Sequence, residues 1–212
     1  MPRLDPKHST TSHRQTFMRV VLWLLTFLRL AFIPLFLWVA TTAQEVARGG
    51  GDASATRWTA LGILFVMGLT DVADGIIARR YALATQIGAV ADAAADKLAQ
   101  FVFLVFFAVT EGPVFTSLPL WFIAVIFGRD LLGLVGWLTL RARYGPIEII
   151  HNWHGKATTG AVAFVLICAA LGLRESLLEP ILLGTAVLAL SSILAYFFEG
   201  RARGRRLGQA GS

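Results

Sequence analysis

The sequence predicts an all-α integral membrane protein with six transmembrane helices, and its composition and apolar runs carry this prediction. Of its 212 residues, 56% are hydrophobic and only 15% are charged, whereas about a quarter of an average soluble domain is charged. Six apolar runs, each close to the length that a helix needs to cross a bilayer, follow one another along the chain. A single domain accounts for all of them.

The basic residues indicate the orientation of these helices. The net charge is +6. The Lys and Arg residues lie at the two ends of the chain and between the apolar runs, where they can contact anionic membrane lipids and set the topology. Nucleic-acid-binding proteins instead carry a basic stripe with aromatic partners, so no nucleic acid is expected as a partner. Six spans place both termini on one side, together with residues 79–87 and 141–156. Because this side collects most of the Lys and Arg, the positive-inside rule makes it cytoplasmic.

Three segments are expected along the chain. Residues 1–17 form a cytoplasmic tail or an interfacial helix, residues 18–200 form the six-helix domain, and residues 201–212 form a basic cytoplasmic tail. Within the domain the predicted helices are 18–42, 58–78, 88–109, 118–140, 157–173 and 177–198. A signal peptide is a competing interpretation of the first run, but Arg29 within it and its length argue against cleavage.

The stretch 71–97 places four aspartates in or beside very apolar sequence. Asp71 and Asp74 are three residues apart, and Asp92 and Asp96 are four apart, so each pair falls on one face of a helix. Two antiparallel helices joined by a short turn would bring all four carboxylates to one end. Carboxylates next to hydrocarbon are costly unless they are paired or bind cations, which makes this stretch the candidate functional site.

Carboxylate oxygens are hard ligands suited to Mg²⁺, Mn²⁺ or Ca²⁺. Four of them suit a two-metal site that clamps the attacking and leaving oxygens of a phosphoryl displacement. Pairing of the aspartates with Arg79, Arg80 and Lys97 is the alternative. Arg29 in the first helix also needs a partner or a cavity.

The spacing of this stretch resembles the signature of the CDP-alcohol phosphatidyltransferases, D-x2-D-G-x2-A-R-x8-G-x3-D-x3-D. The chain has every fixed residue, namely Asp71, Asp74, Gly75, Ala78, Arg79, Gly88, Asp92 and Asp96. Members related to phosphatidylglycerophosphate and cardiolipin synthases are also similar at Leu25–Arg29, Pro34, Gly128–Asp130 and Gly155–Thr159. One departure is that Leu22 and Trp23 stand where many members have Pro-Asn or Pro-Thr, so no nucleotide contact is inferred there.

The resemblance implies six transmembrane helices, a homodimer, and a polar cavity open to the cytosol. It implies two Mg²⁺ or Mn²⁺ ions per site, with Asp71, Asp74 and Asp92 holding the first. Asp71, Asp92 and Asp96 would hold the second, and Asp96 would also be the general base. The residues that would contact the CDP group are Gly75, Arg79, Thr85, Thr26, Gly88, Asp71 and Asp74.

The implied reaction transfers a phosphatidyl group from CDP-diacylglycerol to an acceptor alcohol and releases CMP. The cations expected near the acceptor are Arg129, Lys156, Arg141 and Arg143. Together they favour a phosphate-bearing acceptor, which we expect to be glycerol 3-phosphate. In the alternative interpretation Arg129 pairs with Asp130 or extends to the headgroups, and the loop cations only set topology or touch lipid headgroups.

Other acceptors and other classes of protein stay open. Phosphatidylglycerol as acceptor would give cardiolipin, and inositol phosphate or serine would define further members of the family. A membrane prenyltransferase also uses aspartate motifs and Mg²⁺, but its two motifs usually lie much further apart. A divalent-cation transporter would place aspartates near the bilayer midplane, often with internal repeats.

Overall fold

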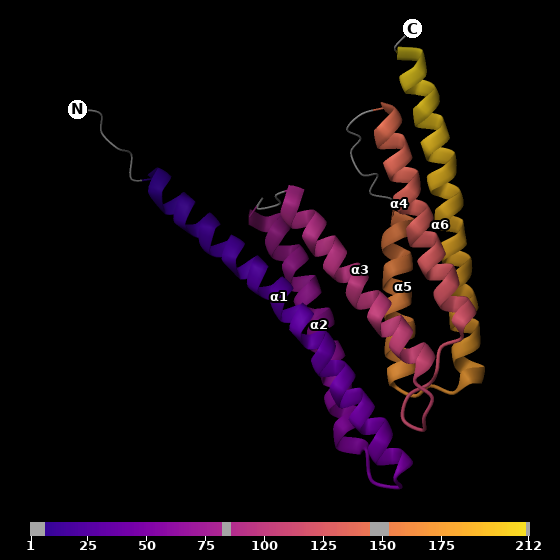
Figure 1. Ribbon diagram of the computed structural model, residues 1–212. Helices are drawn as coiled ribbons and strands as arrows, with labels where there is room; N and C mark the ends of the chain where they lie inside the picture. Colours follow the sequence, from indigo (N-terminus) through magenta and orange to yellow (C-terminus); the bar gives the residue numbers. More distant parts are fainter. Residues whose placement is uncertain (1–6, 82–85, 145–152, 211–212) are drawn as a thin grey trace. The chain divides into compact units, whose positions relative to one another are not determined.

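A computed structural model shows that the chain consists of helices joined by short loops (Figure 1). It describes the backbone of residues 7–81, 86–144 and 153–210 and the side chains of residues 24, 27–70, 94–139, 141–142, 155 and 157–194. The helices are α1 Lys7–Arg48, α2 Ser54–Tyr81, α3 Gln86–Val109, α4 Leu120–Tyr144, α5 Trp153–Ala170 and α6 Glu175–Ala210. The predicted all-α class is confirmed, and the residues described here form six helices.

Several helix ends differ from the prediction. Helix α1 begins at Lys7, inside the segment predicted to be a tail or an interfacial helix, and it continues to Arg48 through residues that were expected to form a loop. Helix α6 continues to Ala210, through most of the predicted basic tail. Polar and basic residues are compatible with helix formation, so the end of an apolar run is a poor guide to the end of a helix.

Three of the helices contain described segments long and apolar enough to cross a membrane. These segments are Phe27–Arg48 in α1, Leu120–Thr139 in α4 and Glu175–Leu194 in α6. At 1.5 Å per residue, 20 residues span about 30 Å, the thickness of the hydrocarbon layer. Ala157–Ala170 in α5 is apolar but shorter.

The chain forms two compact units, residues 1–102 and 103–212, and α3 begins in the first and ends in the second. In the first unit α1 packs against α2, and both helices bury a stripe with heptad-like spacing. The buried side chains are Ile33, Phe36, Ala40 and Ala43 on α1 and Ala60, Ile63 and Met67 on α2. Because lipid is as apolar as these side chains, close packing rather than the hydrophobic effect holds such helices together, and alanine permits a close approach.

The turn between α1 and α2 is built by glycine and an acidic cap. Gly50 has a φ of +78°, and the N–H groups of Gly50 and Gly51 bond back to the carbonyls of Ala47 and Val46 at 3.1 and 2.9 Å. This is the Schellman pattern that ends helices. Asp52 then accepts hydrogen bonds from the hydroxyl and backbone N–H of Ser54.

These bonds, the hydroxyl bond first, hold the pKa of Asp52 below its ordinary value of 3.8. Because the pKa is lower in the folded state, the ionised carboxylate stabilises the start of α2 at pH values above the ordinary pKa. The stabilisation is lost as the pH falls through the lowered pKa.

In the second unit both α4 and α5 pack against α6. The loop between α3 and α4 is fastened at several points. Phe115 makes edge-to-face ring contacts with Phe106 and Phe107, with ring centroids 6.4 and 5.9 Å apart. The Thr116 N–H donates to the carbonyl of Ala169 at 3.0 Å, and its hydroxyl donates to the carbonyl of Leu173 at 2.5 Å. The loop is thereby tied to the C-terminal end of α5.

Gly172 ends α5 with the same Schellman geometry. Its φ is +63°, its N–H bonds to the Ala169 carbonyl at 3.0 Å, and the Leu173 N–H bonds to the Cys168 carbonyl at 3.1 Å. A side chain at a positive φ is strained, so Gly172 is required by the backbone rather than by packing.

Gly172→Ala is therefore expected to destabilise the protein by about 1 kcal/mol. The matched control is Gly160→Ala, because Gly160 lies inside α5 and an added Cβ there meets nothing within 4 Å. Alanine is favoured over glycine inside a helix, so the control should be neutral or stabilising. Thermal unfolding in detergent tests both variants, and an equal effect of the two would contradict the role of Gly172.

Candidate functional site

The predicted site residues lie at the adjoining ends of two consecutive helices. Asp71, Asp74, Gly75 and Arg79 belong to the last turns of α2, and Gly88, Asp92 and Asp96 belong to the first turns of α3. The backbone is helical at both aspartate pairs, as the spacing predicted. Only residues 82–85 separate Tyr81 from Gln86, so the two helix ends lie within about 18 Å of each other.

Most side chains of this stretch lie outside the described residues. This holds for Asp71, Asp74 and Asp92, for Arg79, and for Thr26 on α1, whereas Thr85 lies in a segment whose backbone is not described either. Among the described side chains no group of three or more His, Cys, Asp or Glu could hold a metal ion. The predicted metal site therefore stays a prediction, and Asp96 is its described member.

Asp96 pairs with Arg29. The Nη1 of Arg29 on α1 donates to Oδ1 of Asp96 on α3, 67 residues further along the chain. The Arg29 side chain is 4% exposed and the Asp96 side chain is 41% exposed. The sequence predicted that Arg29 needs a partner or a cavity, but nothing in it identified Asp96. Because the two residues are so far apart in sequence, no helical spacing could have found this pair.

Lys97 is one of the expected alternative partners of the aspartates. Its Nζ donates to the side-chain carbonyl of Gln100 at 3.3 Å, one turn along the exposed face of α3. Arg29 supplies Asp96 with a cation from α1. This links α1, which packs against α2, to the start of α3.

Arg129, a predicted acceptor residue, lies in the interior of the second unit and is 9% exposed. Its Nη1 donates to Oδ1 of Asp130 at 2.6 Å, and its Nε donates to the hydroxyl of Ser192 on α6 at 3.1 Å. The pairing with Asp130 is the alternative that the sequence left open. The bond to Ser192 was not anticipated, and it attaches α4 to α6.

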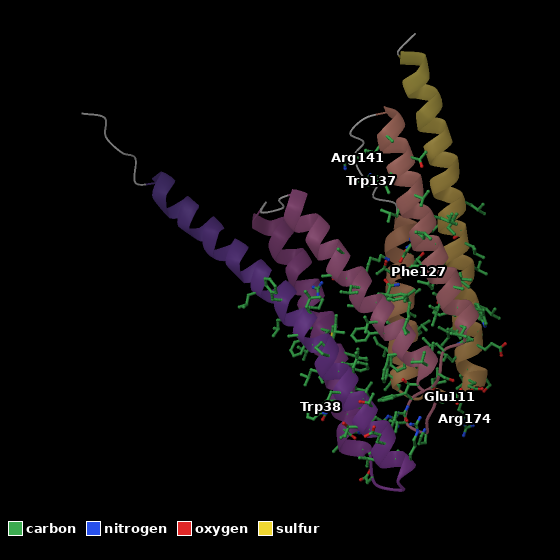
Figure 2. The ribbon with its side chains drawn as sticks, in the orientation of Figure 1. Trp38, Glu111, Phe127, Trp137, Arg141 and Arg174 are labelled. Carbon is green, nitrogen blue, oxygen red and sulfur yellow. The ribbon has the colours of Figure 1, made fainter. Side chains whose placement is uncertain are left out.

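The other predicted acceptor cations are less fully described. Arg141 is exposed near the end of α4, and its guanidinium lies 5.1 Å from the ring centroid of Trp137 (Figure 2). A stacked Arg–Trp pair is typical of the region where membrane meets water. The side chains of Arg143 and Lys156 lie outside the described residues.

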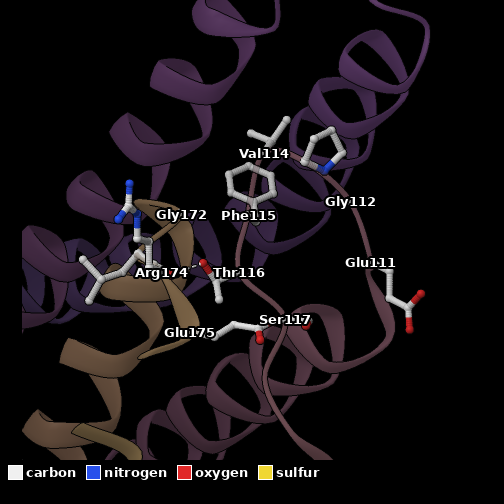
Figure 3. Close-up of a pocket in the computed structure, with 11 residues that line it drawn as sticks. Glu111, Gly112, Val114, Phe115, Thr116, Ser117, Gly172, Arg174 and Glu175 are labelled. Atoms are coloured by element: carbon white, nitrogen blue, oxygen red, sulfur yellow. Dashed lines mark hydrogen bonds between the residues drawn. The ribbon is translucent and has the colours of Figure 1, made fainter. Parts of the chain in front are cut away.

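A pocket of about 520 Å³ opens between the loop after α3 and the turn before α6 (Figure 3). Its lining comes from Glu111–Ser117 and Gly172–Glu175, and it includes none of the predicted site residues. Its charged groups are Glu111, Arg174 and Glu175, all at the rim of turns that the sequence assigned to the side opposite the aspartates.

A family model for CDP-alcohol phosphatidyltransferases matches residues 22–197, which is most of the chain and includes the whole aspartate stretch. The chain belongs to the CDP-alcohol phosphatidyltransferase family. Family membership confirms the resemblance that the motif spacing indicated, and it agrees with the apolar helices described above.

The curated relatives that the chain matches carry three related names. A probable phosphatidylglycerophosphate synthase of Mycobacterium tuberculosis is 35% identical over 136 residues, 64% of this chain and 58% of that protein. A cardiolipin synthase (CMP-forming) of Streptomyces coelicolor is 34% identical over 138 residues, with the same two shares. A CDP-diacylglycerol–glycerol-3-phosphate 3-phosphatidyltransferase of Pseudomonas fluorescens is 29% identical over 157 residues, 69% of this chain and 70% of that protein. The alignment thus spans less than two thirds of the first two relatives.

Ser192→Ala is expected to destabilise the protein by about 1 kcal/mol, because it removes an acceptor from a buried guanidinium. The control is Ser191→Ala. Among the contacts described for it, the Ser191 hydroxyl donates only to the Leu188 carbonyl of its own helix, at 2.8 Å. The control variant should change the free energy of unfolding by no more than about 0.5 kcal/mol. Thermal unfolding in detergent compares them, and equal melting temperatures for the two variants would show that the Arg129–Ser192 bond contributes nothing.

Proposed function

We propose that this protein transfers a phosphatidyl group from CDP-diacylglycerol to the hydroxyl of glycerol 3-phosphate, releasing CMP and forming phosphatidylglycerol phosphate. The observation that carries the proposal is the complete family motif on two consecutive helix ends, with Asp96 paired to a buried arginine. Names of the mycobacterial and pseudomonad relatives favour glycerol 3-phosphate as the acceptor. The name of the Streptomyces relative favours the second candidate, in which phosphatidylglycerol is the acceptor and cardiolipin the product.

The proposed chemistry is an in-line displacement at phosphorus. The acceptor oxygen attacks the phosphorus that bears diacylglycerol, the bond from that phosphorus to the bridging oxygen of the diphosphate breaks, and CMP departs with the bridging oxygen. Asp96 takes the proton of the acceptor hydroxyl. Its partly exposed carboxylate is consistent with this role, because a general base has to be reached by the group that it deprotonates.

The donor set of the motif fits hard divalent cations. We propose that Asp71, Asp74 and Asp92 hold one Mg²⁺ or Mn²⁺ and that Asp71, Asp92 and Asp96 hold a second. Bound there, the two ions would neutralise the diphosphate charge. Gly75, Arg79, Thr85, Thr26 and Gly88 would contact the CDP group, and Arg129, Arg141, Arg143 and Lys156 would attract the acceptor phosphate.

The proposed setting is the cell membrane. All six helices would span it, with both termini and residues 79–87 and 141–156 on the cytosolic side, where the positive-inside rule places basic segments. The aspartate stretch would then open to the cytosol, where the CDP group of the donor and a water-soluble acceptor can reach it. A homodimer is proposed on family resemblance alone.

Asp96→Asn is expected to lower CMP release by at least about 100-fold, the usual contribution of a general base. The control is Asp52→Asn, which changes an exposed aspartate in the turn between α1 and α2 and should keep the rate within about two-fold. CMP release in detergent at saturating Mg²⁺ and Mn²⁺, with melting temperatures for both variants, is the measurement. A folded Asp96→Asn protein with the wild-type rate would refute the assignment of the base.

The acceptor is tested with CDP-diacylglycerol and a panel of glycerol 3-phosphate, phosphatidylglycerol, inositol phosphate and serine, with products identified by mass. Phosphatidylglycerol phosphate is the expected product. Cardiolipin would select the second candidate. If no acceptor elicits CMP release, the proposed reaction is wrong.

A further inference from the structure

The pair of Arg29 and Asp96 joins two helices that the motif does not connect, because the motif lies on α2 and α3 and Arg29 lies on α1. We propose that Arg29 is a positioning residue, which holds the carboxylate of Asp96 in the orientation from which it accepts the proton of the acceptor. This inference rests on the proposed function, in which Asp96 is the general base.

The unequal exposure of the two side chains is the first reason. At 4% exposure Arg29 is enclosed by protein, whereas Asp96 at 41% is still accessible. Arg29 therefore approaches the carboxylate from the protein interior and engages Oδ1, while part of the Asp96 side chain stays accessible to solvent. This arrangement fixes the carboxylate from one side and leaves it accessible from the other.

The place of Arg29 on α1 is the second reason. Positions 29, 33, 36, 40 and 43 follow the three- and four-residue spacing of one helix face, and all five residues are buried. Arg29 thus occupies a core position of the α1 stripe, next to Ile33 at 7% exposure and Phe36 at 0%. A position surrounded in this way gives a guanidinium a fixed direction.

The energetics of buried ion pairs are the third reason. Replacing such a pair by apolar residues of similar volume is often neutral or stabilising, because the desolvation of two charges offsets their attraction. An arginine in the apolar stripe of α1 is therefore poorly explained by stability. It is well explained by orientation, since a planar guanidinium fixes the direction of a carboxylate better than a flexible ammonium does.

The helix contacts extend this reasoning from the side chain to the site. Helix α1 packs against α2, which carries Asp71 and Asp74. The bond from Arg29 to Asp96 therefore ties α3 to the packed α1–α2 pair. Through it, the fourth aspartate of the motif is held relative to the helix that carries the first two.

The test compares Arg29→Met, Arg29→Lys and Arg29→Gln with the control Arg48→Met, which removes a guanidinium from the opposite end of the same apolar segment. For each protein, kcat, the KM for CDP-diacylglycerol and the melting temperature in detergent are measured. Arg29→Met is expected to lower kcat by about 10- to 100-fold, as for residues that orient a catalytic group. Its KM for the donor should stay within about two-fold, and Arg29→Lys should recover part of kcat.

A second measurement tests the Arg29–Asp96 pair through protein stability and does not depend on catalytic turnover. Melting temperatures of Arg29→Met, Asp96→Asn and the double variant form a double-mutant cycle. The double variant is expected to be more stable than the sum of the two single effects predicts, because either single change already removes the bond between them.

Each outcome supports or overturns the positioning role of Arg29. A folded Arg29→Met protein with wild-type kcat, or a loss of kcat that merely follows the loss of folded protein and recurs in Arg48→Met, would overturn the positioning role. Additive melting temperatures would show that the pair does not form. If Arg29→Met does not fold, the kcat of Arg29→Gln and Arg29→Lys decides instead. A wild-type protein that releases no CMP with any acceptor refutes the proposed function itself, while the cycle of melting temperatures still tests the pair.

Discussion

A charged side chain inside a helix that is apolar enough to cross a membrane has to be paired, and this constraint shapes the described interior of the protein. Arg29 in α1 and Arg129 in α4 both lie inside such segments and are both almost fully buried. Each is bonded to a carboxylate, Asp96 and Asp130 respectively. An unpaired cation at either place would cost several kcal/mol (on the order of 3 or more). The Arg29–Asp96 pair also joins α1 to α3, whereas α4 is joined to α6 by the bond from Arg129 to Ser192.

The helices were predictable because a membrane leaves few alternatives to a helix for an apolar run of about 20 residues. Their ends were predictable only where a residue stops the helix by its own geometry. Gly50 and Gly172 are such residues, since both adopt a positive φ. Residues 43–57 were expected to form a glycine-rich loop, but nothing in Ala-Gln-Glu-Val-Ala-Arg at 43–48 disfavours a helix, and α1 continues through these six residues.

The candidate site was predictable to the extent that its chemistry is local in sequence. The aspartate spacings place the four positions on helix faces, and the helices are confirmed at both pairs. The partner of Asp96 was not predictable, because Arg29 lies 67 residues away and any of several cations was equally available. Arg129 shows the opposite case. Its partner Asp130 is its neighbour in the chain, and the sequence suggested this pairing as an alternative, whereas the bond to Ser192 was not predicted.

The two arginine–aspartate pairs differ in a way that bears on their roles. Asp130 is 22% exposed, and its arginine also bonds Ser192, so the arginine of this pair joins α4 to α6. Asp96 is 41% exposed and is held from the interior side, so this pair presents a carboxylate while fixing it. A guanidinium has five N–H donors, so pairing with Asp130 does not by itself exclude Arg129 from binding an acceptor phosphate. The exposure of the two carboxylates nevertheless separates them: the more exposed one belongs to the family motif, and the less exposed one does not.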